Sequence, residues 1–243
     1  MKLIFNADDF AMTKGVTYGI LEAYRTGVVK STTMLANGLA FDLAAEAAKA
    51  NPGLDIGIHL TLTFGRPVSK DVKTLVNKEG RFYRQIEELM ATPYSKQEVE
   101  REFIAQIEKV EAAGIRFTHF DMHHIIEPHV YEIQHKLAAK YGVSVRRAVA
   151  ALDYGSLQTP DLFLGDFYGD EATLATLAKI IETYKNTDKV IELMTHPAFL
   201  DEDLLKISSY TKDRMRELSL LTSPELFDMI KRAKAKVISY KEL

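Results

Sequence analysis

Residues 2–9 read K-L-I-F-N-A-D-D, an apolar run that changes abruptly to polar residues. The run predicts a short buried strand over residues 2–5. Val16 and Ile20 follow at helical spacing, so residues 15–25 are predicted to form a helix. This order of strand, polar strand end and helix sets the pattern that the rest of the chain repeats.

Strand-like and helix-like segments alternate along the whole sequence. Further strands are predicted over residues 31–35, 55–60, 116–120, 143–147, 190–194 and 236–240. Helices are predicted between them over residues 40–50, 95–113, 130–141, 171–184 and 224–233. Seven strands interleaved with helices favour an α/β fold with a parallel sheet. At 243 residues a single-domain (β/α) barrel is the natural closed form, and an open doubly wound sheet is the alternative.

The clearest helix is the one over residues 95–113. Val99, Phe103 and Ile107 place an apolar stripe along it. Ser95 followed by Glu98 predicts a capping box, in which each side chain bonds to the backbone N–H of the other residue.

Two segments interrupt the alternation. Residues 65–94 and 154–169 are rich in glycine, proline and charged residues, and neither shows a helical or strand period. Long loops in a compact domain are often lids or binding loops. We therefore expect one domain over residues 1–243, with these two insertions lying over the active-site face.

The composition excludes several classes of protein. There is no cysteine, which removes disulfides, thiolate nucleophiles and iron–sulfur clusters. The 31 Lys and Arg nearly balance the 34 Asp and Glu, whereas a dedicated nucleic-acid binder usually carries a basic excess. Residues 1–9 lack the features of a signal peptide, and no apolar stretch approaches the roughly 20 residues of a membrane helix. We expect a cytoplasmic protein that binds neither nucleic acid nor membrane.

Residues that bind metals or move protons follow four of the predicted strands. Asp8 and Asp9 follow the first, His59 lies in the third, His123 follows the fourth and His196 follows the sixth. The carboxyl ends of parallel strands meet on one face of such a fold, and ligands bind there. We therefore expect these side chains to share one pocket.

Each of these residues also has a purely structural interpretation. Asp8 and Asp9 could cap the first helix, since Asp is a favoured N-cap. His59 could be a buried, hydrogen-bonded histidine, and His123 with His124 could be a surface pair. Their joint occurrence at equivalent strand ends favours a functional cluster.

One carboxylate and two imidazoles would hold a divalent cation and leave coordination positions open, as catalytic sites do. The second aspartate could then act as a general base and His196 as a general acid. Asp121 could orient a ligand histidine through its other ring nitrogen. Other kinds of catalytic or nucleotide-binding site lack support in the sequence. It has no G-x-S-x-G, no phosphate-binding loop, no G-x-G-x-x-G and no H-E-x-x-H.

Seven motifs occur in an order that resembles the YdjC family of carbohydrate, or chitooligosaccharide, deacetylases. They are N-A-D-D-F at 6–10, G-V-x-x-G-I at 15–20, S-T-T-x-x-x-N-G at 31–38, G-I-H-L at 57–60, T-H-x-D-x-H-H at 118–124, M-T-H-P at 194–197 and R-x-x-E-L-x-x-L-T at 214–222. The combination is specific, although no single motif is.

The resemblance implies a distorted (β/α) barrel, a divalent cation usually assigned as magnesium, frequently a homodimer, and hydrolysis of an N-acetyl group from an acetylated sugar. By motif, Asp9, His59 and His123 resemble the metal ligands. Asp8 resembles the general base, and His196 resembles a catalytic acid or a substrate contact. Which aspartate of the pair binds the metal is left open.

Further positions are expected around this centre. Asp121, His124 and Arg146 are candidates for binding substrate or supporting the ligands, with Arg146 also a candidate contact for the acetyl oxygen. Aromatic residues in or beside the two insertions could stack on sugar rings: Phe64, Phe82, Tyr83 and Tyr168.

The sequence departs from the family pattern at three positions. Ala11 stands where the family usually has glycine, Met122 replaces a serine, and Ile125 ends the histidine run. The metal carries a chemical tension too, since magnesium prefers oxygen ligands whereas imidazole suits zinc. Magnesium is expected from the resemblance, with zinc as the alternative.

Two other classes of function remain open at this point. One is a metal-dependent amidohydrolase or phosphoesterase that acts on a non-sugar substrate. The other is a non-catalytic barrel that binds sugar or metal, although binding alone requires neither a base nor an acid.

Overall fold

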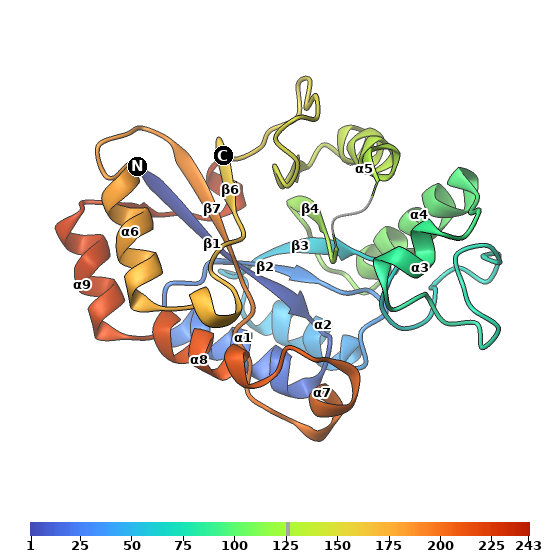
Figure 1. The fold of residues 1–243 in the computed structure, drawn as a ribbon, viewed down its shortest axis with the longest axis horizontal. Helices are drawn as coiled ribbons and strands as arrows, with labels where there is room; N and C mark the ends of the chain where they lie inside the picture. Colours follow the sequence, from blue (N-terminus) through green and yellow to red (C-terminus); the bar gives the residue numbers. More distant parts are fainter. Residues whose placement is uncertain (125–126) are drawn as a thin grey trace.

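The structure, a computed structural model, describes residues 1–124 and 127–243 (Figure 1). The strands in these ranges are β1 (Lys2–Phe10), β2 (Ser31–Met34), β3 (Asp55–Leu60), β4 (His119–Met122), β5 (Ser144–Val145), β6 (Leu162–Leu164), β7 (Val190–Thr195) and β8 (Lys236–Val237). The helices are α1 (Lys14–Thr26), α2 (Phe41–Ala50), α3 (Ile86–Met90), α4 (Lys96–Ala112), α5 (Pro128–Tyr141), α6 (Leu174–Tyr184), α7 (Glu202–Ile207), α8 (Lys212–Leu221) and α9 (Pro224–Arg232). Ile125, the end of the histidine run, lies outside the described residues.

The strands form one parallel sheet in the order β5-β4-β3-β2-β1-β7-β6, and β8 pairs with β1. Around this sheet the strands follow chain order from β1 to β5, and from β6 through β7 back to β1. That is the order of a barrel, opened between β5 and β6, which do not pair in the described part of the chain. The expected distorted barrel is confirmed, whereas a doubly wound sheet would reverse its strand order.

Helices cover the outside of the curled sheet. In Figure 1, α6 and α9 lie together at one end of the molecule, and α3 and α4 lie at the other. Helices α1, α2 and α8 run along one side of the sheet. The main apolar core joins the buried faces of the strands to these helices, with Phe5, Val16 and Ile58 fully buried in it. No helix in the described ranges is long and apolar enough to cross a membrane.

Strand β1 is longer than the sequence predicts. It continues past residue 5 to Phe10, because its backbone pairs with β7 as far as Ala7 and with β2 as far as Phe10. Both aspartates of the N-A-D-D-F motif are therefore strand residues. The side chain of Thr13 caps helix α1, so the interpretation of Asp8 and Asp9 as helix caps is wrong.

The two insertions contain structure that the sequence pattern does not predict. Residues 65–94 include α3, and residues 154–169 include the three-residue strand β6. Ser95 caps α4 as expected, but the predicted capping box is only half formed. The Glu98 carboxylate accepts hydrogen bonds from the backbone N–H groups of Lys73 and Thr74 instead. This carboxylate thus ties the first insertion to α4.

Candidate active site

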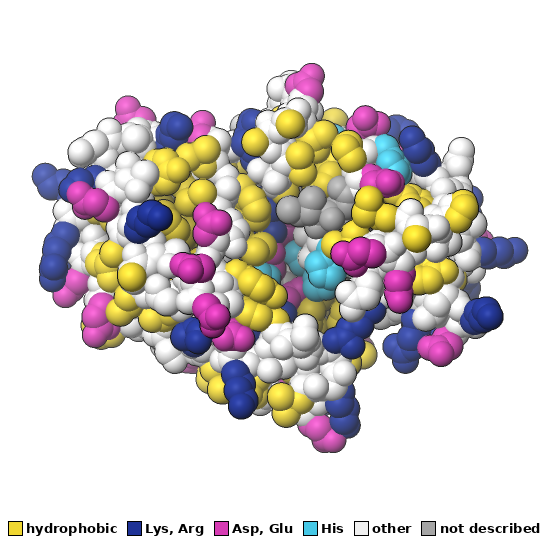
Figure 2. Space-filling view, viewed as in Figure 1, with side chains coloured by type: hydrophobic (Ala, Val, Ile, Leu, Met, Phe, Trp, Pro, Cys, Tyr) yellow, Lys and Arg dark blue, Asp and Glu magenta, His cyan; other side chains and the backbone are white. Residues whose placement is uncertain are grey.

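A cavity of about 490 Å³ opens where the carboxyl ends of the strands meet. Figure 2 shows a hollow near the centre of the visible face, with histidine and acidic side chains at its floor and hydrophobic side chains on its rim. All four strand ends singled out in the sequence contribute to this region. The cavity is lined by the expected residues Asp9, His123, His124, Arg146 and His196.

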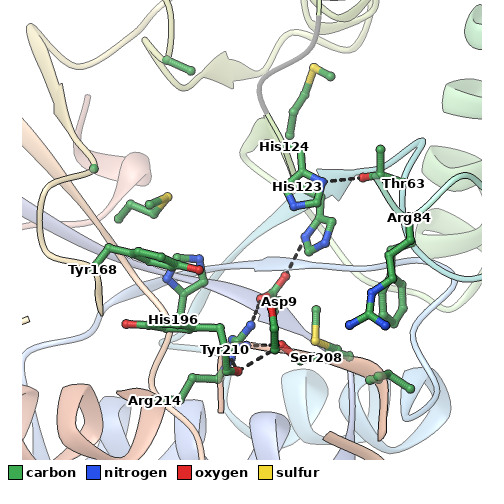
Figure 3. Close-up of a pocket in the computed structure, with 18 of the residues that line it drawn as sticks. Asp9, Thr63, Arg84, His123, His124, Tyr168, His196, Ser208, Tyr210 and Arg214 are labelled. Carbon is green, nitrogen blue, oxygen red and sulfur yellow. Dashed lines mark hydrogen bonds and ion pairs between the residues drawn. The ribbon is translucent and has the colours of Figure 1, made fainter. Parts of the chain in front are cut away.

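Asp9 lies in a local distortion of β1. Its φ is +74°, and the register between β1 and β2 shifts between Ala7 and Phe10. Aspartate tolerates this left-handed conformation better than most residues. The distortion turns the Asp9 side chain into the cavity, while Asp8 keeps its place in the strand. Figure 3 shows Asp9 between His123 and Arg214.

The two oxygens of Asp9 have different surroundings. Oδ2 accepts a 2.7 Å hydrogen bond from Arg214. Oδ1 lies 2.9 Å from His123 Nδ1, yet it accepts no well-directed hydrogen bond from any described residue. Burial raises the pKa of Asp9, but the charges of Arg214 and His123 outweigh burial and hold this pKa well below its usual range. Asp9 therefore presents one buried, ionised and unpaired oxygen to the cavity.

His59 reaches the same point from β3. Its Nε2 lies 3.4 Å from Asp9 Oδ1, and its Nδ1 lies 2.6 Å from Asp121 Oδ1. Burial lowers the pKa of His59, but the Asp121 charge and its hydrogen bond outweigh burial and raise this pKa to about 10. Asp121 thus fixes the ring orientation of His59, which is the part that the sequence suggested for it.

Asp9 Oδ1, His59 Nε2 and His123 Nδ1 form a small triangle. The third edge, between the two ring nitrogens, is 3.3 Å long. Ligands about 2.0–2.2 Å from a metal ion lie roughly 3–3.5 Å from one another, so these separations fit a single cation. The unpaired Asp9 oxygen is a second sign of fit, because a cation would satisfy it. These three residues are one of two donor groups found in the described part of the chain.

The other donor group consists of Asp8, His59 and Asp121. Here the guanidinium of Arg146 already occupies the space between the carboxylates. Arg146 donates two 2.7 Å hydrogen bonds to Asp8 and lies 3.0 Å from Asp121 Oδ2. Burial raises the pKa of Asp8, but Arg146 outweighs burial and holds this pKa at about 2. A fixed positive charge at this position disfavours a second cation.

His196 closes the opposite side of the cavity, at the end of β7. Its backbone N–H donates to Glu217 Oε2, and its ring lies edge-on to Tyr168 and Tyr210. Burial and the charge of Arg214 lower the pKa of His196 to about 4, so its ring is neutral near pH 7. Burial raises the pKa of Glu217 to about 7.

His124 is close to the triangle without being part of it. Its Nδ1 lies 2.7 Å from Thr63 Oγ1, and its ring packs against His123. Burial and the His123 charge lower the pKa of His124 to about 4, so it lines the cavity as a neutral ring. This places it where it can contact a substrate.

The aromatic candidates divide into two pairs. Phe64 and Tyr168 line the cavity, and Tyr168 stacks on Tyr210 with ring centroids 4.0 Å apart. Phe82 is buried in the core, and Tyr83 packs against that core outside the cavity lining.

Three further side chains that reach the site come from a region for which the sequence pattern predicts no helix or strand. Tyr210, Arg214 and Glu217 lie on or just before α8, and all three surround Asp9 or His196. The R-x-x-E-L motif contains two of them, which is the signal that could have identified them. All three side chains are buried. Charged residues are seldom buried unless they are paired, and Arg214 and Glu217 both have partners here.

The model of the YdjC-like protein family matches residues 2–232. A carbohydrate deacetylase from Listeria monocytogenes is 53% identical over 246 residues, which cover 100% of both chains. A carbohydrate deacetylase from Brevibacillus brevis is 44% identical and is likewise covered completely. Among solved structures, a candidate cellobiose-phosphate cleavage protein from Enterococcus faecalis superposes with a TM-score of 0.93, with 34% identity and coverage of 99% of this chain and 98% of that one.

Proposed function

Because the chain belongs to the YdjC-like protein family, we propose that it is a metal-dependent deacetylase that hydrolyses the N-acetyl group of a chitooligosaccharide-like sugar. The enzyme class follows from relatives named carbohydrate deacetylases, which are 40–53% identical over at least 98% of the chain. Metal dependence, the sugar and the roles of individual residues are the proposal. The observation that carries it is the donor triangle of Asp9, His59 and His123.

A divalent cation held by this triangle would act as a Lewis acid, which lowers the pKa of a water and polarises a carbonyl oxygen. Two imidazole nitrogens and one carboxylate oxygen suit zinc better than magnesium, while the family resemblance favours magnesium. Both ions are therefore included in the test below.

We assign Asp8 as the base that takes a proton from the attacking water. Arg146 keeps its carboxylate ionised at neutral pH and fixes its orientation. The same ion pair makes Asp8 a weak base, since a pKa near 2 lies far from the value that suits proton transfer at pH 7. Asp8 is therefore suited to accept a proton from a water whose pKa a cation has already lowered.

We assign His196 as the acid that gives a proton to the departing amine nitrogen as the C–N bond breaks, while the proton taken by Asp8 passes to solvent. Its neutral ring lines the cavity, and Nδ1 has no hydrogen-bond partner among the described residues. Negative charge that develops on the acetyl oxygen would raise the proton affinity of this ring. The Glu217 carboxyl, 3.9 Å from Nδ1, would further stabilise a protonated His196.

The cavity suits a small sugar. Its volume of about 490 Å³ is in the range of small-molecule sites. Phe64 and Tyr168 offer aromatic faces for sugar rings, while Thr63, Arg84 and Ser208 add polar groups at the wall (Figure 3). This mixture of ring faces and hydrogen-bonding groups favours a carbohydrate over a purely apolar amide. A phosphoesterase of the type that uses two metal ions is disfavoured, because Arg146 contacts both carboxylates of the second donor group.

The test is acetate release from diacetylchitobiose and longer N-acetylated chitooligosaccharides. We expect release by the purified protein, loss of release after chelation, and recovery when Mg²⁺ or Zn²⁺ is added back singly. The ion that restores activity at the lower concentration identifies the preferred metal. Bound metal with no acetate released from any acetylated sugar would favour a non-sugar substrate or a binding role.

A further inference from the structure

The last residues of the chain close the sheet at the end opposite the cavity. β8 pairs with the first residues of β1, and the backbone N–H of Ile238 donates to Leu3 O. The next residues cross the starts of β2 and β3, where Tyr240 N–H donates to Ser31 Oγ and Lys241 N–H donates to Asp55 Oδ2. We call residues 236–243 the C-terminal segment. It lies outside residues 2–232, which the family model matches.

Tyr240 extends from this segment into the sheet interior. It is 3% exposed, and its ring stacks on His119 with centroids 3.7 Å apart and an interplanar angle of 5°. Its hydroxyl donates a 2.6 Å hydrogen bond to Glu192 Oε2. Gly57 leaves room for the stacked pair, because a Cβ there would lie 2.5 Å from His119 Nε2.

A continuous set of polar contacts joins Tyr240 to Asp8. Glu192 is fully buried in β7, and its Oε1 accepts a 2.9 Å hydrogen bond from Arg146 Nε. Arg146 in turn donates through both terminal nitrogens to Asp8. The Glu192 carboxylate therefore holds one edge of the guanidinium while Asp8 accepts from another.

A second set of contacts reaches the same carboxylate from the stacked histidine. His119 Nε2 lies 3.1 Å from Asn6 Oδ1, and Asn6 Nδ2 donates a 2.8 Å hydrogen bond to Asp8 Oδ1. The ring of Tyr240 covers the face of His119, and its hydroxyl fixes Glu192. One side chain thus supports both partners that orient Asp8.

We propose that Tyr240 is a positioning residue for the deacetylation reaction, and that the C-terminal segment is part of the active-site architecture. This inference rests on the proposed role of Asp8 as the base. Tyr240 contacts neither substrate nor cation; it acts through Glu192 and Arg146 on one side and through His119 and Asn6 on the other.

A segment that merely covered the sheet end would not need the hydroxyl. Ile238 and Leu243 already pack with Ile4 in an apolar cluster at this end. Burying a hydroxyl against a buried carboxylate is costly unless the hydrogen bond is well made. The short bond to Glu192 instead places a donor at the one carboxylate oxygen that Arg146 does not use.

Tyr240→Phe tests the hydroxyl while keeping the stacked ring. We expect kcat for acetate release to fall roughly 10-fold, a typical effect of removing a supporting hydrogen bond around a metal site. KM and the affinity for Zn²⁺ should stay within about two-fold, because neither substrate nor cation loses a contact. Tyr184→Phe is the matched control, since the Tyr184 hydroxyl on α6 makes no hydrogen bond within the described residues. Unchanged kcat in Tyr240→Phe would overturn the proposal.

A double-mutant cycle with Glu192→Gln shows whether Tyr240 acts through Glu192. In the Glu192→Gln background, Tyr240→Phe should lower kcat by much less than it does in the wild type, because coupled residues are not additive. Equal fold-losses in both backgrounds would overturn the proposed path. Melting temperatures identify assay conditions in which every variant is folded.

A crystal structure of Tyr240→Phe separates this inference from the proposed function, because it needs no activity. We expect the two hydrogen bonds from Arg146 to Asp8 to be lengthened or lost. Unchanged pairing would overturn the positioning role even in an active enzyme. If the wild type releases no acetate, the proposed function fails, and displacement of Arg146 would still support the contact path from Tyr240 to Asp8.

Discussion

Asp8 and Asp9 are adjacent and identical, yet the fold gives them opposite surroundings. Both are buried, and each is paired with an arginine. Arg146 engages both oxygens of Asp8, whereas Arg214 engages only one oxygen of Asp9. The second oxygen of Asp9 faces two histidines without a hydrogen bond from a described residue.

The difference shows how one strand can supply two kinds of carboxylate. Strand residues alternate between the faces of a sheet, so neighbours normally point apart. Asp9 has a positive φ that departs from regular strand geometry, and both carboxylates lie near His59. The arginine partners make the two carboxylates different. Both oxygens of Asp8 accept hydrogen bonds from Arg146, whereas Asp9 keeps one oxygen that could bind a cation. The geometry thus favours Asp9 as the ligand, a choice that the sequence leaves open.

The largest expected effect comes from exchanging each carboxylate for an amide. Asp9→Asn should weaken Zn²⁺ binding by at least about 100-fold and abolish acetate release, because it removes a donor of the triangle. Asp8→Asn should keep Zn²⁺ binding and lower kcat by roughly 10²–10⁴-fold, the usual contribution of a general base. Calorimetric titration with Zn²⁺ and an acetate assay measure the two effects.

Asp203→Asn, on the exposed surface of α7, is the control for both variants and should resemble the wild type. The assignment would have to be reversed if Asp8→Asn lost the cation while Asp9→Asn retained it.

A smaller effect should appear in the acid stability of the fold. Because the folded-state pKa of Asp8 is lowered from 3.8 to about 2, its ionised form stabilises the protein above pH 4. This contribution is lost as the pH falls from about 4 to about 2, and the shift corresponds to about 2 kcal/mol. The free energy of unfolding of Asp8→Asn, measured in urea, should therefore approach that of the wild type between pH 5 and pH 2.5. A wild-type advantage that is the same at both pH values would contradict the ion-pair explanation.

The smallest effect concerns Ala11, the second residue with a positive φ at the end of β1. Ala11 has a φ of +79°, a conformation that glycine adopts without strain. Ala11→Gly relieves about 1–2 kcal/mol of backbone strain but loses a buried methyl group and gains unfolded-state entropy. We expect the free energy of unfolding to change by less than about 1 kcal/mol, with Zn²⁺ affinity unchanged.

Ala11→Val provides the contrast. A β-branched residue is a true outlier at positive φ, so this variant should be clearly less stable in thermal unfolding than both the wild type and the Ala11→Gly variant. A stable Ala11→Val variant would show that the end of β1 does not require the conformation seen at this position.

Much of the fold was predictable because its signals are local. Strand β3 matches the predicted range, and helices α2 and α5 differ from it by only a few residues, since apolar periodicity and flanking glycine and proline define them. Strand β6 was not predictable, because three residues between proline and glycine carry no period. The Ser95–Glu98 pattern was misleading in part, because a backbone loop distant in sequence competes for the Glu98 carboxylate.

The candidate site was also predictable only where its signals are local or follow from strand order. Asp9, His59 and His123 could be brought together from strand order alone, because parallel strand ends share one face. Strand order could not place Arg214 and Glu217 at the site, because both belong to helix α8. They reach Asp9 and His196 through contacts between residues distant in sequence. The contacts of Arg146 with three carboxylates depend likewise on three strands meeting, which no local pattern records.

Strand β1 lies in the middle of the sheet, although it is the first element of the chain. Its residue Lys2 pairs with Val190, and this long separation makes its contacts strongly non-local. Pairings of that kind tend to form slowly, because the entropy of closing so long a loop is lost before the contact is made. During synthesis β1 is made long before β7, so its two carboxylates can meet His196 and Arg214 only after the chain has been extended past residue 214. A shorter chain already contains Asp9, His59 and His123 but lacks Arg214, the arginine that pairs with Asp9.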